Sequence, residues 1–185
     1  MKRFKLFCSA IAALTVLALA GCDMEVPDSE KVNVIPGLVM SGKGATSYGD
    51  TMTAYSKAMI GSWNVSTYTG GTLEDGKIVG ATKIAEGETV TGDKWWSNNE
   101  QTTTASLEDN STVIIEATAL AKDNQVFFEA TDGTNYISVN PHNDAWGTGV
   151  TYNSYGAPAV EVGTVIRFYI TRSGNTVSFK VSVVE

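Results

Sequence analysis

The sequence predicts an all-β fold, a single β-sandwich of the jelly-roll or lectin-like kind. Apolar and polar residues alternate with a period of two in several runs, most clearly at 113–119, 166–170 and 177–183. Turn sequences such as Ser173-Gly174-Asn175 separate these runs, and no long segment has helical periodicity. Because successive side chains of a strand point to opposite faces, such runs bury one face in a core. Many short strands divided by turns are typical of sandwiches.

The first elements are the least regular. Residues 32–40 are apolar enough to form a first strand, and the spacing of Met52, Tyr55 and Met59 predicts one helical turn. From Ser62 onward the pattern is that of strands. We expect the earlier strands at 63–68, 77–84 and near 90–96.

The later strands are better defined. In the run 113–119 we expect Val113, Ile115, Ala117 and Ala119 to face the core. Turns at 121–124 and 131–134 then bound a strand at 126–130. In the next strand, 136–140, Ile137 and Val139 should face inward, and the outward residues should be Tyr136, Ser138 and Asn140. Runs around the loop at 173–175 predict a hairpin with Phe168 and Phe179 in the core.

The N-terminus has the pattern of an export signal. Lys2, Arg3 and Lys5 precede an apolar stretch, 6–20, which ends in the tetrapeptide Leu19-Ala20-Gly21-Cys22. The apolar stretch is too short for a spanning helix and ends in small residues, as signal peptides do. This segment resembles the type II signal peptides of bacterial lipoproteins.

That resemblance implies cleavage before Cys22, lipidation of Cys22 with palmitate or a related acyl chain, and a location in the bacterial cell envelope. The chain would then hang from the membrane by its lipid and face the periplasm or the cell exterior. We accordingly divide the sequence into a cleaved signal peptide (1–21), a lipidated N-terminus and tether (22–50) and a β-sandwich domain (51–185). Pro27, Pro36 and several glycines in 22–50 are typical of a tether.

The formal net charge of −7 excludes some partners. An acidic surface disfavours nucleic acid and anionic lipid headgroups, so membrane contact should come through the lipid alone. Cys8 lies in the signal and Cys22 would carry lipid, so no cysteine remains for a disulfide. We expect a monomer whose fold depends on its core.

Groups typical of catalysis are scarce. His142 is the only histidine, so a serine triad or a histidine-rich metal site is hard to build. We therefore expect no enzymatic activity and no catalytic residues, although a glycan hydrolase or lyase with two facing carboxylates is an alternative. The turns at Asp109, Asp123, Asp132 and Asp144 are rich in oxygen. They leave a structural Ca²⁺ open as an alternative, and no other cofactor is expected.

Aromatic residues grouped with amides are the strongest indication of binding. A sugar ring stacks on a flat aromatic side chain while its hydroxyls bond to amides, carboxylates or guanidinium groups. Two clusters and one strand have that composition, and we take as candidate ligand-binding residues Trp95, Trp96, Asn98, Asn99 and Gln101, then Asn140, His142, Asn143, Asp144, Trp146, Tyr152 and Tyr155, and Arg167. Trp95 and Trp96 should face opposite ways on a strand, so one should be exposed. Arg167 would contribute only if the polar face of its strand lines a groove.

Three stretches resemble the jelly-roll modules of bacterial polysaccharide-degrading enzymes and surface lipoproteins: Gly61-Ser62-Trp63, residues 95–99, and residues 165–181 with their hairpin. The resemblance implies carbohydrate binding without catalysis. We therefore expect a lipid-anchored module that binds a polysaccharide or oligosaccharide. The alternative is a structural or interaction lipoprotein, such as an adhesin or envelope factor, with no sugar site.

Overall fold

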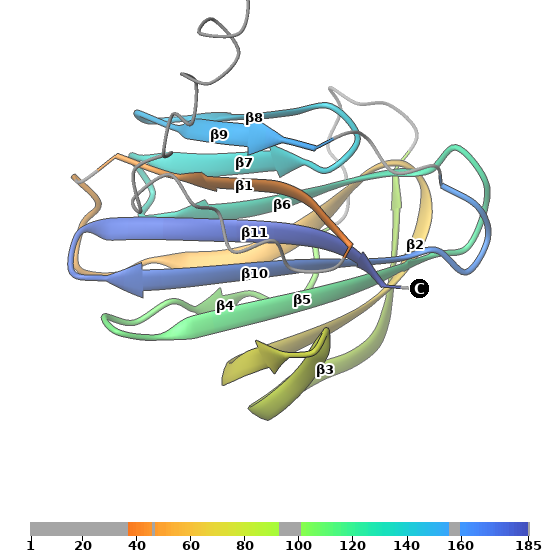
Figure 1. The fold of residues 1–185 in the computed structure, drawn as a ribbon, viewed down its shortest axis with the longest axis horizontal. Coiled ribbons are helices and arrows are strands. Elements are labelled where there is room, and N and C mark those ends of the chain that lie inside the picture. Colours follow the sequence, from red (N-terminus) through yellow and green to blue (C-terminus); the bar gives the residue numbers. More distant parts are fainter. Residues whose placement is uncertain (1–36, 46, 93–100, 156–159, 185) are drawn as a thin grey trace, which may run out of the picture. The chain divides into compact units, whose positions relative to one another are not determined.

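The computed structural model describes residues 37–45, 47–92, 101–155 and 160–184, without the side chains of residues 58 and 59. Within these ranges the fold consists of strands joined by turns, so the predicted all-β sandwich class is confirmed (Figure 1). The described residues contain no helix that could cross a membrane. The strands are β1 (Leu38–Lys43), β2 (Thr53–Glu74), β3 (Lys77–Gly92), β4 (Ala105–Ser106), β5 (Thr112–Ala119), β6 (Gln125–Thr131), β7 (Tyr136–Asn140), β8 (Asp144–Gly147), β9 (Thr151–Ser154), β10 (Val165–Ser173) and β11 (Thr176–Val184).

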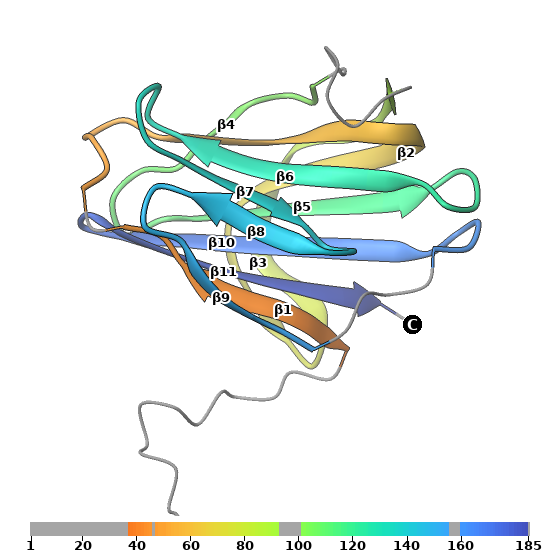
Figure 2. The same cartoon turned by 90° about the horizontal axis from the view of Figure 1, so that it is seen from above.

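β2 belongs to both layers of the sandwich. Its second half pairs with β3 and β5, and the sheet continues through β10, β11 and β1 to β9; we call this sheet I. Its first half pairs with β4 and β6, and the sheet continues through β7 to β8; we call this sheet II. The strand turns from one sheet to the other at Gly61, whose φ of 77° suits glycine. Every pairing is antiparallel, and Figure 2 shows the two layers from above.

The core lies between the two sheets. Phe128 on β6 of sheet II stacks on Phe168 on β10 of sheet I, with ring centroids 4.9 Å apart and planes 5° apart. Phe179 on β11 packs against Phe168 at 6.2 Å. Trp63, also fully buried, donates from its indole Nε1 to the carbonyl oxygen of Gln125 at 3.1 Å. Because aromatic side chains from both layers meet there, burial of apolar area holds the sheets together.

The predicted inward residues of the regular runs are buried. This holds for Val113, Ile115, Ala117 and Ala119 of β5 and for Phe168 and Phe179 of the terminal hairpin. It also holds for Ile137 and Val139 of β7. Ser138 and Asn140, predicted to face outward, are also buried although they lie on the outer face. Ser138 lies between its strand partners Glu129 and Trp146, whose larger side chains flank it.

In the N-terminal part, β1 overlaps the first strand expected at 32–40, and the structure differs from two other expectations. β1 pairs with β11 on one side and with β9 on the other, so the sandwich includes residues that we assigned to a tether reaching residue 50. The helical turn suggested by Met52, Tyr55 and Met59 is instead the start of β2. Met52, Ala54 and Ser56 are all buried, so the true period is two, and the spacing of the larger side chains only coincided with that of a helix.

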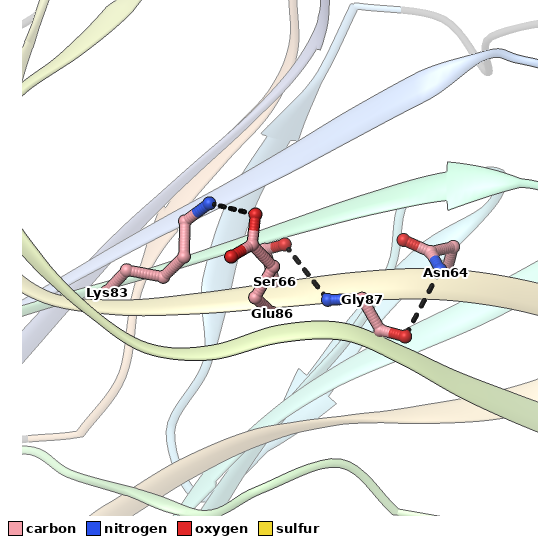
Figure 3. A network of polar contacts seen from close by, with 5 residues as sticks. All are labelled: Asn64, Ser66, Lys83, Glu86 and Gly87. Atoms are coloured by element: carbon pink, nitrogen blue, oxygen red, sulfur yellow. Dashed lines mark hydrogen bonds and ion pairs between the residues drawn. The ribbon is translucent and has the colours of Figure 1, made fainter.

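β2 and β3 are irregular where they pair near Ser66. Glu86 and Gly87 of β3 stand opposite that single residue of β2, which makes a β-bulge. Figure 3 shows how side chains hold it: Asn64 Nδ2 donates to the Gly87 carbonyl at 3.2 Å, and the Gly87 amide donates to Ser66 Oγ at 3.4 Å. An exposed ion pair between Lys83 and Glu86 at 2.8 Å flanks the bulge. Bulges of this kind increase local twist.

A candidate ligand pocket on sheet II

The outer face of sheet II carries an aromatic pair that belongs to no core. Phe127 precedes the core residue Phe128 on β6 and points to the opposite face, since neighbours on a strand face opposite ways. Trp146 on β8 meets Phe127 edge to face, with ring centroids 5.0 Å apart and planes at 81°. Phe127 is 8% exposed and Trp146 is 37% exposed. The pair therefore presents one accessible indole on a buried ring.

A pocket of about 460 Å³ opens beside this pair, at the edge of sheet II where β6 and β8 begin and β7 ends. Apolar side chains of Ile60, Phe127 and Trp146 form part of its lining. The described residues that line it are Ile60, Gln125, Phe127, Asn140, Asn143, Asp144 and Trp146. This volume falls within the range of small-ligand pockets, roughly 300–1,000 Å³.

The turn from β7 to β8 positions the polar half of the lining. Asn140 Oδ1 accepts the amide of His142 at 3.0 Å, and the Asn140 carbonyl accepts the amide of Asn143 at 3.1 Å. Asparagine favours such turns because its side chain bonds to the backbone two residues on. Asn140 and Asp144 are then direct partners across the two strands. The turn thus brings three polar side chains to one edge of the pocket.

Several polar groups of the lining remain available to a ligand. Asp144 Oδ1 accepts the amide of Ala145 at 3.2 Å and the hydroxyl of Tyr152. Within the described part of the chain, Asp144 Oδ2 and the side-chain amides of Gln125 and Asn143 make no hydrogen bond. Two amides and one carboxylate oxygen therefore surround the aromatic pair, which gives both donors and acceptors.

Tyr152 fixes the carboxylate from the neighbouring strand β9. Its hydrogen bond to Asp144 raises the pKa of the Tyr152 hydroxyl, with desolvation as a smaller cause. Its ring is as exposed as that of Trp146. Because Tyr152 donates its proton to Oδ1, Asp144 is held in one orientation.

The structure brings together most of the second predicted cluster. Asn140, Asn143, Asp144 and Trp146 line the pocket and Tyr152 contacts its rim. His142 is half-buried and its ring lies against Trp63, with centroids 6.3 Å apart. Tyr155 is exposed, and its amide donates to the Val39 carbonyl at 2.6 Å. His142 and Tyr155 are outside the lining.

The first predicted cluster lies almost wholly beyond the described residues. Trp95, Trp96, Asn98 and Asn99 fall in the range 93–100, so the predicted exposure of one of the two tryptophans stays a prediction. Gln101 is described: it is exposed and bridges to Lys57 on β2, and it does not line the pocket.

Arg167 does not belong to this pocket. It lies on β10 of sheet I, is 7% exposed, and its Nε and Nη2 both donate to Glu116 Oε2, at 3.1 and 2.5 Å. Its Nη1 donates to the carbonyl of Gly76, in the turn between β2 and β3. The structure therefore does not bring Arg167 together with the other candidates, because the β2–β3 hairpin covers its guanidinium.

Three pocket residues were absent from the sequence-based candidates: Ile60, Gln125 and Phe127. A signal for one of them existed. Phe127 and Phe128 are adjacent aromatic residues on a predicted strand, so one of them had to face away from the core. Ile60 and Gln125 carry no such signal, since pairing between β2 and β6 brings them to the pocket.

Metal ligands do not gather in the described residues, which contain no group of three or more histidine, cysteine, aspartate or glutamate side chains. Of the aspartates considered for Ca²⁺, Asp132 accepts hydrogen bonds from the amides of Gly49, Thr134 and Asn135. Asp109 accepts the amide of Gly174. These two carboxylates bond to the backbone of turns.

Comparison of the chain with protein-family models, with curated proteins and with solved structures gave no match in any of the three.

Proposed function

We propose that this protein is a non-catalytic, lipid-anchored glycan-binding module of the bacterial cell envelope. The observation that carries the proposal is the pocket on sheet II, where an exposed indole stands beside polar groups that no described residue engages. A sugar ring has apolar C–H faces and a rim of hydroxyls. Such a ligand matches an aromatic surface bordered by amides and a carboxylate.

Each part of the pocket has a role in this proposal. Trp146, supported by the edge of Phe127, would stack on the face of a sugar ring. The amides of Gln125 and Asn143 would each donate to one hydroxyl and accept from another. Asp144 Oδ2 would accept from a hydroxyl. Stacking and hydrogen bonds of this kind fix the orientation of an uncharged ligand in a largely apolar pocket.

The absence of catalysis is also part of the proposal. Glycoside hydrolysis needs two carboxyl groups on either side of the bond that breaks. Asp144 is the one acidic residue among the described residues that line the pocket. This composition favours binding over hydrolysis.

The location follows from the N-terminal sequence. Lys2, Arg3 and Lys5, the apolar stretch and Leu19-Ala20-Gly21-Cys22 support an acyl anchor on Cys22. A sandwich attached in this way would present its pocket to glycans outside the cytoplasm.

The test is retention of the detergent-solubilised protein in native gels that contain soluble polysaccharides, with Trp146→Ala as the variant and Tyr136→Ala as its control. Tyr136 is 43% exposed on β7 but does not line the pocket. Trp146→Ala should weaken retention by about tenfold or more, since a large apolar face contributes roughly 1–3 kcal/mol when a ligand buries it. Tyr136→Ala should bind like the wild type.

Melting curves separate binding from folding. Trp146 is partly exposed, so its replacement should lower stability by no more than about 1 kcal/mol. Asn143→Ala, at an exposed turn residue, gives a second variant that weakens binding without touching the aromatic pair. If no polysaccharide retains the wild type, the structural or interaction lipoprotein becomes the better description.

A further inference from the structure

The charges around the pocket are unevenly distributed. Among the described residues that line it, Asp144 carries the one formal charge, and no arginine or lysine belongs to the lining. Glu129 is a second carboxylate on the outer face of sheet II, opposite Ser138, which in turn lies opposite Trp146. Within the described lining, the one formal charge that a ligand can meet is therefore negative.

From this arrangement we infer that the pocket selects neutral sugars over acidic ones, with Asp144 as the residue that determines this specificity. The inference rests on the proposed glycan-binding function and adds a ligand class to it. A uronic acid differs from its parent hexose by a carboxylate in place of a hydroxymethyl group. The hydroxymethyl group can donate a hydrogen bond to Asp144, whereas the ionised carboxylate cannot and is repelled.

Asp144 cannot easily turn away from such a ligand. Its Oδ1 accepts the Ala145 amide and the Tyr152 hydroxyl, so two bonds from two strands hold the side chain. The carboxylate would have to lose at least one of these bonds to leave the pocket edge. A fixed charge discriminates between ligands more strongly than one that relaxes into solvent.

The neighbouring charges do not remove this bias. Lys57 on β2 is the cross-strand partner of Phe127, but it does not line the pocket, and β6 and β7 separate its strand from β8. Glu129 accepts the Ser138 hydroxyl at 2.5 Å and lies beside Tyr55. Neither Lys57 nor Glu129 belongs to the described lining, so Asp144 remains its one charged residue.

The test compares pairs of oligosaccharides of equal length that differ at C6, glucose with glucuronate and galactose with galacturonate oligomers. Binding is measured by isothermal titration to the detergent-solubilised protein at low salt. The variants are Asp144→Asn, which keeps the acceptor at Oδ1, and Asp75→Asn as a control of equal charge change. Asp75 lies in the β2–β3 turn with a φ of 47°, which asparagine tolerates.

The wild type and Asp75→Asn should bind the neutral oligomer at least about tenfold more tightly than the acidic one, because like charges in contact repel strongly at a protein surface. Asp144→Asn should narrow this preference to about threefold or less. Added salt should improve binding of the acidic oligomer to the wild type and leave the neutral oligomer unaffected.

Three results would overturn the inference while the glycan-binding function stands: equal binding of both oligomers by the wild type, an unchanged preference in Asp144→Asn, or the same loss of preference in Asp75→Asn. Failure of every oligomer and polysaccharide to bind the wild type would overturn the proposed function itself. If Asp144→Asn melts far below the wild type, the wild type alone tests the inference: binding of the acidic oligomer that does not improve with added salt would overturn it.

Discussion

Asp132 joins the turn between β6 and β7 to the segment that leads into β2. Its carboxylate accepts the amides of Gly49 at 2.7 Å, Thr134 at 2.8 Å and Asn135 at 2.6 Å. The Asn135 side chain adds bonds to Asp132 Oδ2 at 3.0 Å and to the Ser47 carbonyl at 3.2 Å. These donors, chiefly the Gly49 amide, hold the pKa of Asp132 well below its usual value of 3.8.

A pH-dependent stability follows from this carboxylate. Because the folded state lowers the pKa of Asp132, its contribution to stability is present above about pH 4 and is lost as the pH falls below the unfolded-state value. Asp132→Asn should lower the free energy of unfolding by roughly 1 kcal/mol at pH 7, a small value since the site is open to solvent. The difference from the wild type should shrink at about pH 2.5. Urea unfolding at both pH values measures it, and a constant difference would contradict the assignment.

β2 bends at the point where it passes from sheet II to sheet I. Gly61 has a φ of 77°, and a Cβ added there would overlap the side chain of Asn124. Asn124 Nδ2 donates to the carbonyl of Ser62, so this side chain is part of the bend. Backbone conformation and close packing therefore both require glycine at this position.

Gly61→Ala should lower the free energy of unfolding by about 2–4 kcal/mol, the sum of left-handed backbone strain and overlap with a buried side chain. Gly80→Ala is a matched control, because Gly80 has a φ of 69° but open space where its Cβ would lie. Gly80→Ala should lower the free energy of unfolding by only about 1 kcal/mol. Chemical denaturation of both variants compares them. Equal losses of unfolding free energy in the two variants would mean that overlap with Asn124 does not add to the backbone strain at Gly61.

How far the sequence predicts these elements depends on the range of the interactions. The period of two in β5, β10 and β11 identified Val113, Phe168 and Phe179 as core residues, since a buried face repeats every second residue. The apolar run 32–40 indicated a first strand, but it did not show that this strand, β1, extends to Lys43. The spacing of Met52 and Tyr55 predicted a helical turn because the local pattern does not show long-range pairing. This segment is a strand because it pairs with β6.

The candidate pocket divides in the same way. The lining residues from the β7–β8 segment, Asn140, Asn143, Asp144 and Trp146, lie close together in sequence and were predicted as a cluster. The other lining residues come from β2 and β6, so only long-range pairing shows that Ile60 and Phe127 belong to the pocket. Arg167 was misplaced because alternation along β10 does not reveal that the β2–β3 hairpin covers its outer face.

For the whole molecule, the proposed anchor gives the sharpest prediction. Cys22→Ala should abolish incorporation of labelled palmitate by cells that express the protein, because the thiol that accepts the lipid is gone. Cys8→Ala is the matched control, since Cys8 lies in the segment that cleavage removes. It should incorporate palmitate like the wild type. Labelling of Cys22→Ala, or its absence from the wild type, would contradict the lipoprotein assignment.

The pairing of β1 with β11 also determines when folding can finish. Met40 lies opposite Val181, so one of the first described strands is completed by the last one. β2 likewise cannot complete its pairing before β5 and β6, which lie far along the chain, have been synthesised. Contacts of such long sequence separation form slowly, because the ends of a long loop must meet first. The fold of a chain emerging from the ribosome therefore stays incomplete until β11 has been synthesised, which would suit the proposed export of the unfolded chain across a membrane.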